Sequence, residues 1–137
     1  MRKKAAYEEL GYQLCNYRWS WSAENDRGVC IDLWRREIEW TEQRTWFDSR
    51  IHGLPLREWG HKLGNTHRKP HLQRARRKFG GVVDVVLLEG VPNTKVRSAT
   101  PWVPENQNGQ RWVVTDADEE TGHFRAELGA GRSQGGR

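Results

Sequence analysis

Val82-Val83-Asp84-Val85-Val86-Leu87-Leu88 is a nearly continuous run of β-branched residues and leucines. A half-exposed strand alternates apolar and polar side chains, whereas a strand that is covered on both faces is apolar almost throughout. The run therefore predicts a buried strand in the middle of a sheet. We also expect its centre to reject an ionised side chain, because a carboxylate without a partner is strongly unfavourable in a dry core.

Two short helices are predicted from the spacing of apolar residues and from the glycines that follow them. The first covers Lys3 to Leu10 and ends at Gly11. The second covers Arg68 to Phe79 and ends at Gly80-Gly81, with Pro70 in its first turn. Each helix has one apolar face.

Four further strands are predicted to form two hairpins. They are residues 13–23 with 29–34, and residues 111–115 with 123–128. Residues 90–108 are expected to form a long loop, and residues 35–64 give no clear assignment. The order of these elements implies an α+β fold: a single compact domain over residues 1–128, in which a strongly bent, mostly antiparallel sheet wraps a few short helices. Residues 129–137 are expected to form a disordered tail.

The composition limits what the protein can be. The 23 lysines and arginines exceed the 18 acidic residues, which gives a formal charge of +5 and a pI near 9.6. Such an excess of positive charge favours a polyanionic partner. The alternative is that these residues form a solvated surface without a partner. Cys15 and Cys30 are interpreted as reduced packing residues. With no apolar run that could span a bilayer and no signal peptide, a soluble cytoplasmic protein without a membrane partner is expected.

Tryptophan is unusually frequent in this chain. Eight tryptophans occur in 137 residues, and Trp19 and Trp21 are separated by a single residue. On the predicted strand both indoles would point to the same face, because side chains alternate. With Trp34 on the partner strand, and with Trp102, they form a candidate surface for stacking on a nucleobase, where one base can be worth ~1–3 kcal/mol. The alternative is that these indoles fill the core of a small, charge-rich domain.

The second predicted helix carries the densest positive charge of the chain. Its basic residues are Arg68, Lys69, Arg74, Arg76, Arg77 and Lys78. No acidic residue occurs between Asn65 and Gly81, so this charge is not balanced locally. We therefore expect the helix to contact phosphates of a nucleic acid, with a solvated helix face as the alternative.

Motifs for catalysis are weak. His67 and His71 have the helical spacing of metal ligands, but Pro70 lies between them and no further ligand is near in the sequence. Asp84 lacks the acidic-x-Lys element that would accompany a nuclease metal ligand. The chain has no phosphate-binding glycine motif, nucleophile elbow or zinc signature. We therefore expect no catalytic residue, no metal and no cofactor, and an enzyme is the less favoured class.

Three stretches carry a resemblance to known proteins. They are the pattern from Gly11 through Trp19-Ser20-Trp21-Ser22-Ala23 to Trp34, the stretch from Lys69-Pro70-His71-Leu72 to Val83, and the ending from Asp118 to Glu127. In this order they resemble small bacterial domains found beside HNH-type nuclease modules or standing alone in restriction-like proteins. The resemblance implies an accessory module that faces DNA and is not itself a nuclease, since no HNH histidine cluster is present.

The leading prediction is a nucleic-acid-binding module, in which the basic helix contacts phosphates and the indole set stacks on an exposed, flipped or modified base. DNA is preferred over RNA through the resemblance alone. A second reading is a protein-interaction or regulatory protein with exposed tryptophans as interface anchors. A third is a small enzyme whose site assembles from residues 35–64.

Overall fold

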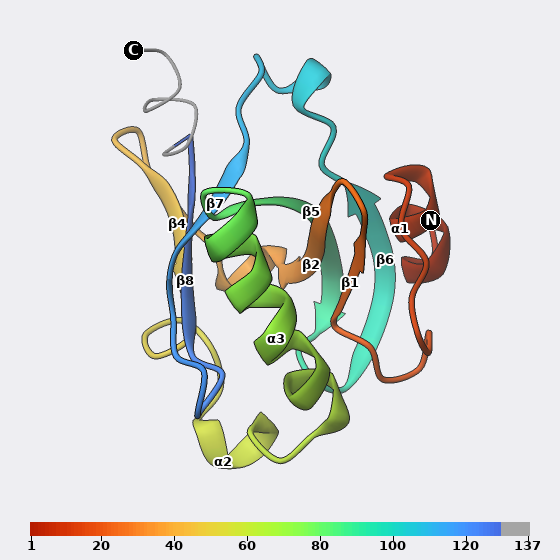
Figure 1. The fold of residues 1–137 in the computed structure, drawn as a ribbon, viewed down its shortest axis with the longest axis vertical. Coiled ribbons are helices and arrows are strands. Elements are labelled where there is room, and N and C mark those ends of the chain that lie inside the picture. Colours follow the sequence, from red (N-terminus) through yellow and green to blue (C-terminus); the bar gives the residue numbers. More distant parts are fainter. Residues whose placement is uncertain (130–137) are drawn as a thin grey trace.

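The computed structural model describes residues 1–129, and its central element is the strand β5, Val82–Val91 (Figure 1). Three strands pair with it: β2 (Gly28–Trp34), β6 (Lys95–Pro101) and β7 (Trp112–Ala117). β2 runs parallel to β5, while β6 and β7 run antiparallel. Residues 85–88 of β5 are buried. The predicted buried strand in the middle of the sheet is confirmed.

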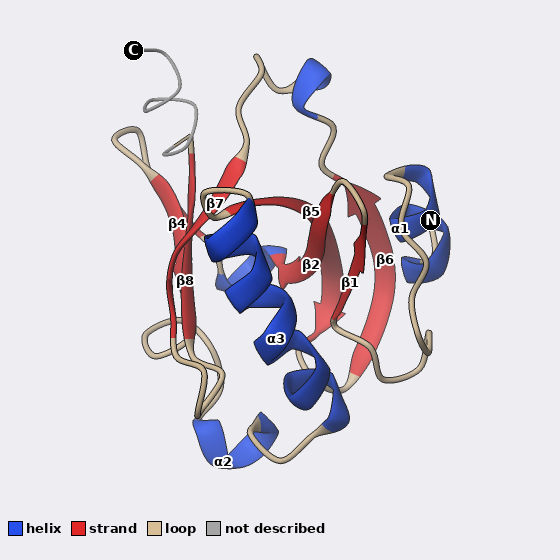
Figure 2. Cartoon of the chain, in the orientation of Figure 1, coloured by secondary structure: helices blue, strands red, loops and turns tan. Residues whose placement is uncertain are grey.

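The described strands form one mixed sheet of eight strands. The others are β1 (Ser22–Asn25), β3 (Glu39–Trp40), β4 (Thr45–Asp48) and β8 (Phe124–Leu128). Their order is β1-β2-β5-β7-β8-β4-β3, with β6 also paired to β5, and every described pair except β2–β5 is antiparallel. Val82 and Val83 pair with β7, whereas β5 pairs with β6 from Val86 onward, so the sheet bends into two halves at this strand (Figure 2).

Helices pack on both faces of this sheet. α3 (Leu63–Lys78) lies inside the bend, where its Leu72 and Ala75 join the larger core (Figure 1). α1 (Lys3–Glu9) covers the other face near β5 and β6 and buries Tyr7. The shorter helical turns are η1 (Arg35–Glu37), α2 (Leu56–Trp59) and η2 (Pro104–Asn106). The predicted α+β class, with short helices on a bent and mostly antiparallel sheet, is confirmed.

The first predicted strand is wrong over most of its length. Residues 13–21 form an irregular loop that leads into β1. Within this loop the Asn16 side chain accepts a hydrogen bond from the Arg18 backbone N–H at 2.8 Å. Such bonds between a polar side chain and the nearby backbone compete with strand formation. Trp19 and Trp21 therefore do not share the face of a strand.

The predicted long loop over residues 90–108 is also wrong. β6 and η2 occupy much of it, and β6 follows β5 through a turn in which Asn93 has a φ of 61°. Asparagine tolerates this left-handed conformation better than most residues, so the Pro-Asn-Thr composition marks a tight turn and not a whole loop. The closing hairpin is confirmed by the pairing of β7 with β8.

α3 begins at Leu63 and not at Arg68, so Pro70 lies inside the helix. The extra N-terminal residues are anchored by the fully buried Asn65, whose amide donates to two backbone carbonyls at 2.9 and 3.0 Å. One of these carbonyls lies in the turn between β7 and β8. Because this contact is tertiary, the local pattern around Pro70 could not predict it. Residues 35–64, unassigned from sequence, contain η1, β3, β4, α2 and the start of α3.

Three smaller expectations concern the cysteines, membranes and the C-terminus. Both cysteines are free; Cys30 is buried as expected, but Cys15 is exposed and so is not a packing residue. Within residues 1–129, no helix combines the length and the apolar character that a bilayer crossing requires. The predicted tail lies outside the described residues from residue 130 onward.

Val85→Asp should abolish cooperative folding. The Val85 side chain is fully buried in the larger core, so an ionised carboxylate there would have no partner and its neutral form would still leave a polar group unsatisfied. Val91→Asp is the matched control, because Val91 lies in the same strand and is 48% exposed. Thermal melts followed by circular dichroism should show a native-like transition for the control only. A Val85→Asp protein that melts at the native temperature would contradict the position of β5 in the core.

Candidate functional site

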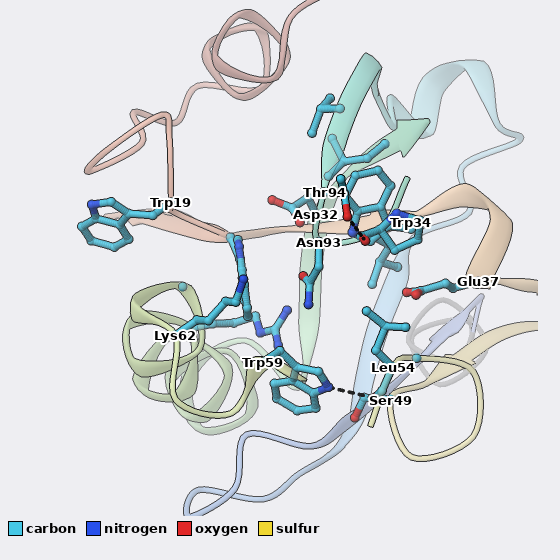
Figure 3. A pocket seen from close by; sticks show the side chains of 18 of the residues that line it. Trp19, Asp32, Trp34, Glu37, Ser49, Leu54, Trp59, Lys62, Asn93 and Thr94 are labelled. Atoms are coloured by element: carbon cyan, nitrogen blue, oxygen red, sulfur yellow. Dashed lines mark hydrogen bonds between the residues drawn. The ribbon is translucent and has the colours of Figure 1, made fainter. Parts of the chain in front are cut away.

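A cavity of about 260 Å³ lies at the carboxyl ends of the parallel strands β2 and β5 (Figure 3). Its walls come from segments far apart in the sequence: α1, the loop before β1, the end of β2, residues 47–54, the start of α3 and the turn between β5 and β6. Ligand sites commonly form outside the carboxyl ends of parallel strands, because the connections leave neighbouring strands in different directions and open a crevice.

Four indoles line this cavity, which we call the tryptophan pocket. They are Trp19, Trp21, Trp34 and Trp59. Trp34 ends β2 and Trp59 ends α2, and Figure 3 shows their rings on different sides of the pocket. Trp59 is buried, and its Nε1 donates to the Leu54 carbonyl at 2.9 Å, which fixes the ring. The other three indoles are half-buried, so part of each ring remains available to a ligand.

Trp19 and Trp21 approach the pocket from the loop before β1 and pack on the first turns of α3. The ring of Trp19 lies 4.6 Å from that of His67, tilted by 57°. Trp21 lies directly on Gly64, where any Cβ would overlap the indole. Glycine is therefore needed at this position for Trp21 to lie against the helix. The two indoles meet at one site through loop-to-helix packing, and not through the predicted strand.

Arg68 is the unusual residue of the pocket. It is only 8% exposed, and its guanidinium forms no hydrogen bond or ion pair with another residue of the range 1–129. Its Cζ lies 4.9 Å from the ring centroid of Trp21, 4.8 Å from that of Phe124 and 5.7 Å from that of Trp59. Cation–π contacts are worth ~0.5–2 kcal/mol, whereas desolvating an ion costs several kcal/mol. A ligand with hydrogen-bond acceptors would supply the missing partners.

The positive charge of Arg68 persists at neutral pH. Burial lowers the pKa of its guanidinium to about 10, and the Asp32 carboxylate, Tyr7 and Glu37 oppose that shift. Asp32 does not bond to Arg68; its Oδ2 instead contacts the Lys3 Nζ at 3.1 Å and accepts a hydrogen bond from the Tyr7 hydroxyl at 3.0 Å. The pocket therefore contains a cation whose N–H donors are not committed to the protein.

Glu37 faces the same cavity from η1 (Figure 3). Burial raises the pKa of its carboxyl group to about 7, although Arg68 and Arg36 oppose the shift. Its side chain forms no hydrogen bond within the described part of the chain. Near neutral pH both the acid and the carboxylate are populated, so Glu37 can donate or accept a hydrogen bond to a ligand.

Ser49 and His123 resemble a nucleophile with its base. The Ser49 Oγ and the His123 Nδ1 are 2.9 Å apart, and burial, followed by the charge of Arg50, lowers the pKa of His123. The same Oγ accepts the Phe124 backbone N–H at 2.9 Å, and no described carboxylate bonds the opposite ring nitrogen. An activated nucleophile needs that third group to orient its base. The pair instead joins the segment after β4 to the start of β8.

The predicted aromatic set is brought together only in part. Trp19, Trp21 and Trp34 line the pocket, but Trp102 does not. The Trp102 ring packs edge-on against Trp112 in the larger core, with 5.8 Å between ring centroids, and is only 7% exposed. The inclusion of Trp102 in a binding surface was therefore wrong, because its partner Trp112 makes it a core residue.

The basic helix does not present its charges as one surface. Arg68 is buried in the pocket and is not on a face that could meet phosphates outside it. The Lys69 Nζ donates to the Glu120 carbonyl at 3.0 Å, and Arg74 pairs with Glu24 at 3.2 Å. The charge that looked unbalanced along the sequence is thus partly balanced in space.

The exposed part of this charge lies at the far end of α3. Its residues are Arg76, Arg77 and Lys78, all in the last turn. They are about 20 Å along the helix axis from Gly64, at a rise of ~1.5 Å per residue. The indole site and the predicted phosphate site therefore lie at opposite ends of the helix.

The pocket residues that the sequence did not predict include Asp32, Glu37 and Trp59. Asp32 occupies a polar position in the alternating pattern of β2, which indicates solvent, but α1 covers that face of the sheet. Glu37 and Trp59 lie in the segment without periodicity. The density of tryptophan within that segment was a usable signal, although it gave no orientation for the rings.

Comparison of this chain with protein-family models, with curated proteins and with solved structures finds no match. The geometry of the tryptophan pocket is therefore the basis for assigning a function. The resemblance to domains found beside HNH-type modules stays a prediction.

The stability of the protein should fall as the pH rises through about 7, and Glu37→Gln should remove that fall. The folded state raises the pKa of Glu37 from 4.5 to about 7, so it binds the proton more tightly than the unfolded state. The resulting stabilisation is complete below the ordinary pKa and is lost as the pH rises through the raised one. Urea midpoints across this pH range, compared between native and variant protein, measure the effect.

Glu42→Gln is the matched control for this experiment, because Glu42 is exposed in the turn between β3 and β4. The urea midpoint of this control should change with pH in the same way as that of the native protein. Taking the difference between native and variant curves cancels the titration of His71 and His123, whose pKa values burial lowers. Parallel curves for native and Glu37→Gln would show that Glu37 is not desolvated in the pocket.

Proposed function

We propose that this protein binds nucleic acid and takes one exposed nucleobase into the tryptophan pocket. Arg68 is the observation that supports this most: a buried guanidinium without a hydrogen bond to another described residue, surrounded by three aromatic rings. A suitable ligand has a flat face for the indoles and acceptors for the guanidinium. A nucleobase has both in one molecule.

The size of the pocket favours one base over a run of stacked bases. Pockets for drug-sized ligands are ~300–1,000 Å³, and the tryptophan pocket, at about 260 Å³, lies just below that range. The base must then be outside a helical stack, either in a single strand or flipped from a duplex. Its polar edge would meet Arg68, Glu37 and the Asn93 amide, which points into the pocket (Figure 3).

Charge around the pocket favours a polyanion as the molecule that carries this base. Three of its lining residues are exposed and basic: Arg18, Lys62 and Lys95. Together with the net charge of +5, they attract phosphates. A free base carries no phosphate, so this charge would not strengthen its binding. The preference for DNA over RNA still comes from the resemblance alone.

A protein partner is the second candidate, and Trp40 is the residue that favours it. Trp40 is 45% exposed on the short strand β3, with the Arg35 guanidinium 5.9 Å from its ring. Tryptophan and arginine are the residues most enriched among energetically important interface positions. Trp40 does not line the tryptophan pocket, so mutation can separate the two candidates.

Arg68→Met should weaken base binding without loss of stability. Methionine is apolar and unbranched, so the variant loses the hydrogen-bond donors but no longer buries an ion without a partner. We expect the free energy of unfolding to stay unchanged or to rise by up to about 4 kcal/mol. Affinity for a single-stranded oligonucleotide should fall at least ~10-fold, because hydrogen bonds to charged groups are worth ~1.5–3 kcal/mol. Urea unfolding and tryptophan fluorescence titration measure the two effects.

Trp34→Ala and Trp40→Ala form a matched pair for the same titration. Trp34→Ala should weaken binding by ~1–3 kcal/mol, the usual loss for one stacked base, whereas Trp40→Ala should bind like the native protein. The proposal is refuted if the native protein binds no oligonucleotide at low salt, or if native, Arg68→Met and Trp34→Ala proteins bind equally. A marked loss of stability in Arg68→Met would assign Arg68 to the fold instead.

A further inference from the structure

A second cavity, of about 240 Å³, adjoins the tryptophan pocket and is lined by three arginines. Its lining residues are Arg35, Arg36, Leu88, Glu89, Gly90 and Arg97. We call it the arginine cavity. Three guanidinium groups face one carboxylate there, so the cavity has a local excess of positive charge. A group of like charges in a concave site favours an anionic ligand.

The partners of these arginines leave most of their donors free. Arg35 forms an ion pair with Glu89, with 3.3 Å between its Nε and the carboxylate, but this buried Nε makes no hydrogen bond within the described residues. Arg36 donates once, to the Gly90 carbonyl at 3.3 Å. The Arg97 side chain forms no hydrogen bond or ion pair within residues 1–129. Arg36 and Arg97 are both exposed, so a ligand can reach them.

The two cavities are joined by the hairpin of β5 and β6. Leu88 lines both of them, and it lies on β5 opposite Trp34, the tryptophan that ends β2. The turn residues 92–94 and the first two residues of β6 line the tryptophan pocket, and the next residue, Arg97, lines the arginine cavity. A chain that leaves one cavity along this hairpin therefore enters the other.

We infer that the arginine cavity binds the phosphodiester backbone of the nucleic acid whose base occupies the tryptophan pocket. This inference rests on the proposed function. Guanidinium groups suit the role, because their planar forks match two phosphate oxygens at once. Each neutralised phosphate also releases counterions, so binding here has a salt dependence that can be measured.

The exposed end of α3 is the competing phosphate site. Positive side chains in the last turn of a helix are stabilised by the helix dipole, so Arg76, Arg77 and Lys78 have a structural reason to be there. They also lie about 20 Å from the start of α3, where that helix lines the tryptophan pocket. The arginine cavity adjoins the pocket, and Arg97 lies in the strand β6, where no helix dipole acts on it.

The test compares two double variants that each remove two positive charges. Arg36→Gln/Arg97→Gln neutralises the arginine cavity, and Arg76→Gln/Arg77→Gln neutralises the end of α3. The probe is a single-stranded DNA homopolymer of about 12 nucleotides, titrated against tryptophan fluorescence at several salt concentrations. Thermal melts of both variants establish that they are folded.

The arginine-cavity variant should lose at least ~10-fold in affinity, and its salt dependence should fall by ~1.4 in log–log slope, which is two phosphate contacts on a single strand. Its fluorescence change at saturation should stay native, because the base still enters the pocket. The α3 variant should change affinity less than ~3-fold, as expected for charge that acts only at long range.

Equal losses in both variants, or a larger loss at α3, would overturn the inference. So would loss of the saturating fluorescence change in Arg36→Gln/Arg97→Gln, because the arginines would then act on the base and not on the backbone. Failure of the proposed function gives a different result: the native protein binds no homopolymer, or Arg68→Met binds it like the native protein.

Discussion

Pairing of β5 on both edges is the constraint from which the rest of the structure follows. β2 pairs with one edge of β5. On the other edge, β7 pairs with the start of β5 and β6 pairs with the rest, and the sheet bends between these two pairings. α3 fills the inside of that bend (Figure 1). Its first turns then meet the carboxyl ends of β2 and β5, with Gly64 providing the close contact that lets Trp21 lie on the helix. The tryptophan pocket is therefore a product of the fold and not an addition to its surface.

Arg68 connects this architecture to the proposed function. The buried face of α3 runs through Gly64, Arg68, Leu72 and Ala75, so an apolar residue would be the stable choice at the second of these positions. Three aromatic rings around the guanidinium reduce the desolvation penalty but leave its N–H donors unused. A natural protein commonly gives up stability in this way at a binding site, because the same group that weakens the empty protein strengthens the complex.

Elements with complete local patterns could be predicted from the sequence, and elements set by distant contacts could not. β5 and α1 have apolar patterns that need no partner to be recognised. The first turn of α3 depends on Asn65 reaching the turn between β7 and β8, which no local window contains. The candidate site divides in the same way. Trp34 can be identified from its position at the end of a predicted strand, whereas Trp59 and Glu37 lie where the sequence has no periodicity. The prediction for Trp102 is wrong because its contact with the core is tertiary.

Charge is the property for which sequence order misleads most. In the densest basic run of the chain, Arg74 forms an ion pair with Glu24. The exposed basic residues of this run lie in the last turn of α3, where the helix dipole already stabilises positive charge. Arg36 and Arg97 are far apart in the sequence, yet the pairing of β5 with both β2 and β6 brings them to one cavity beside the tryptophan pocket. A phosphate is held by guanidiniums that converge on it and have donors to spare. Convergence is a property of the fold, so the count of basic residues along a helix says little about where a nucleic-acid backbone would lie.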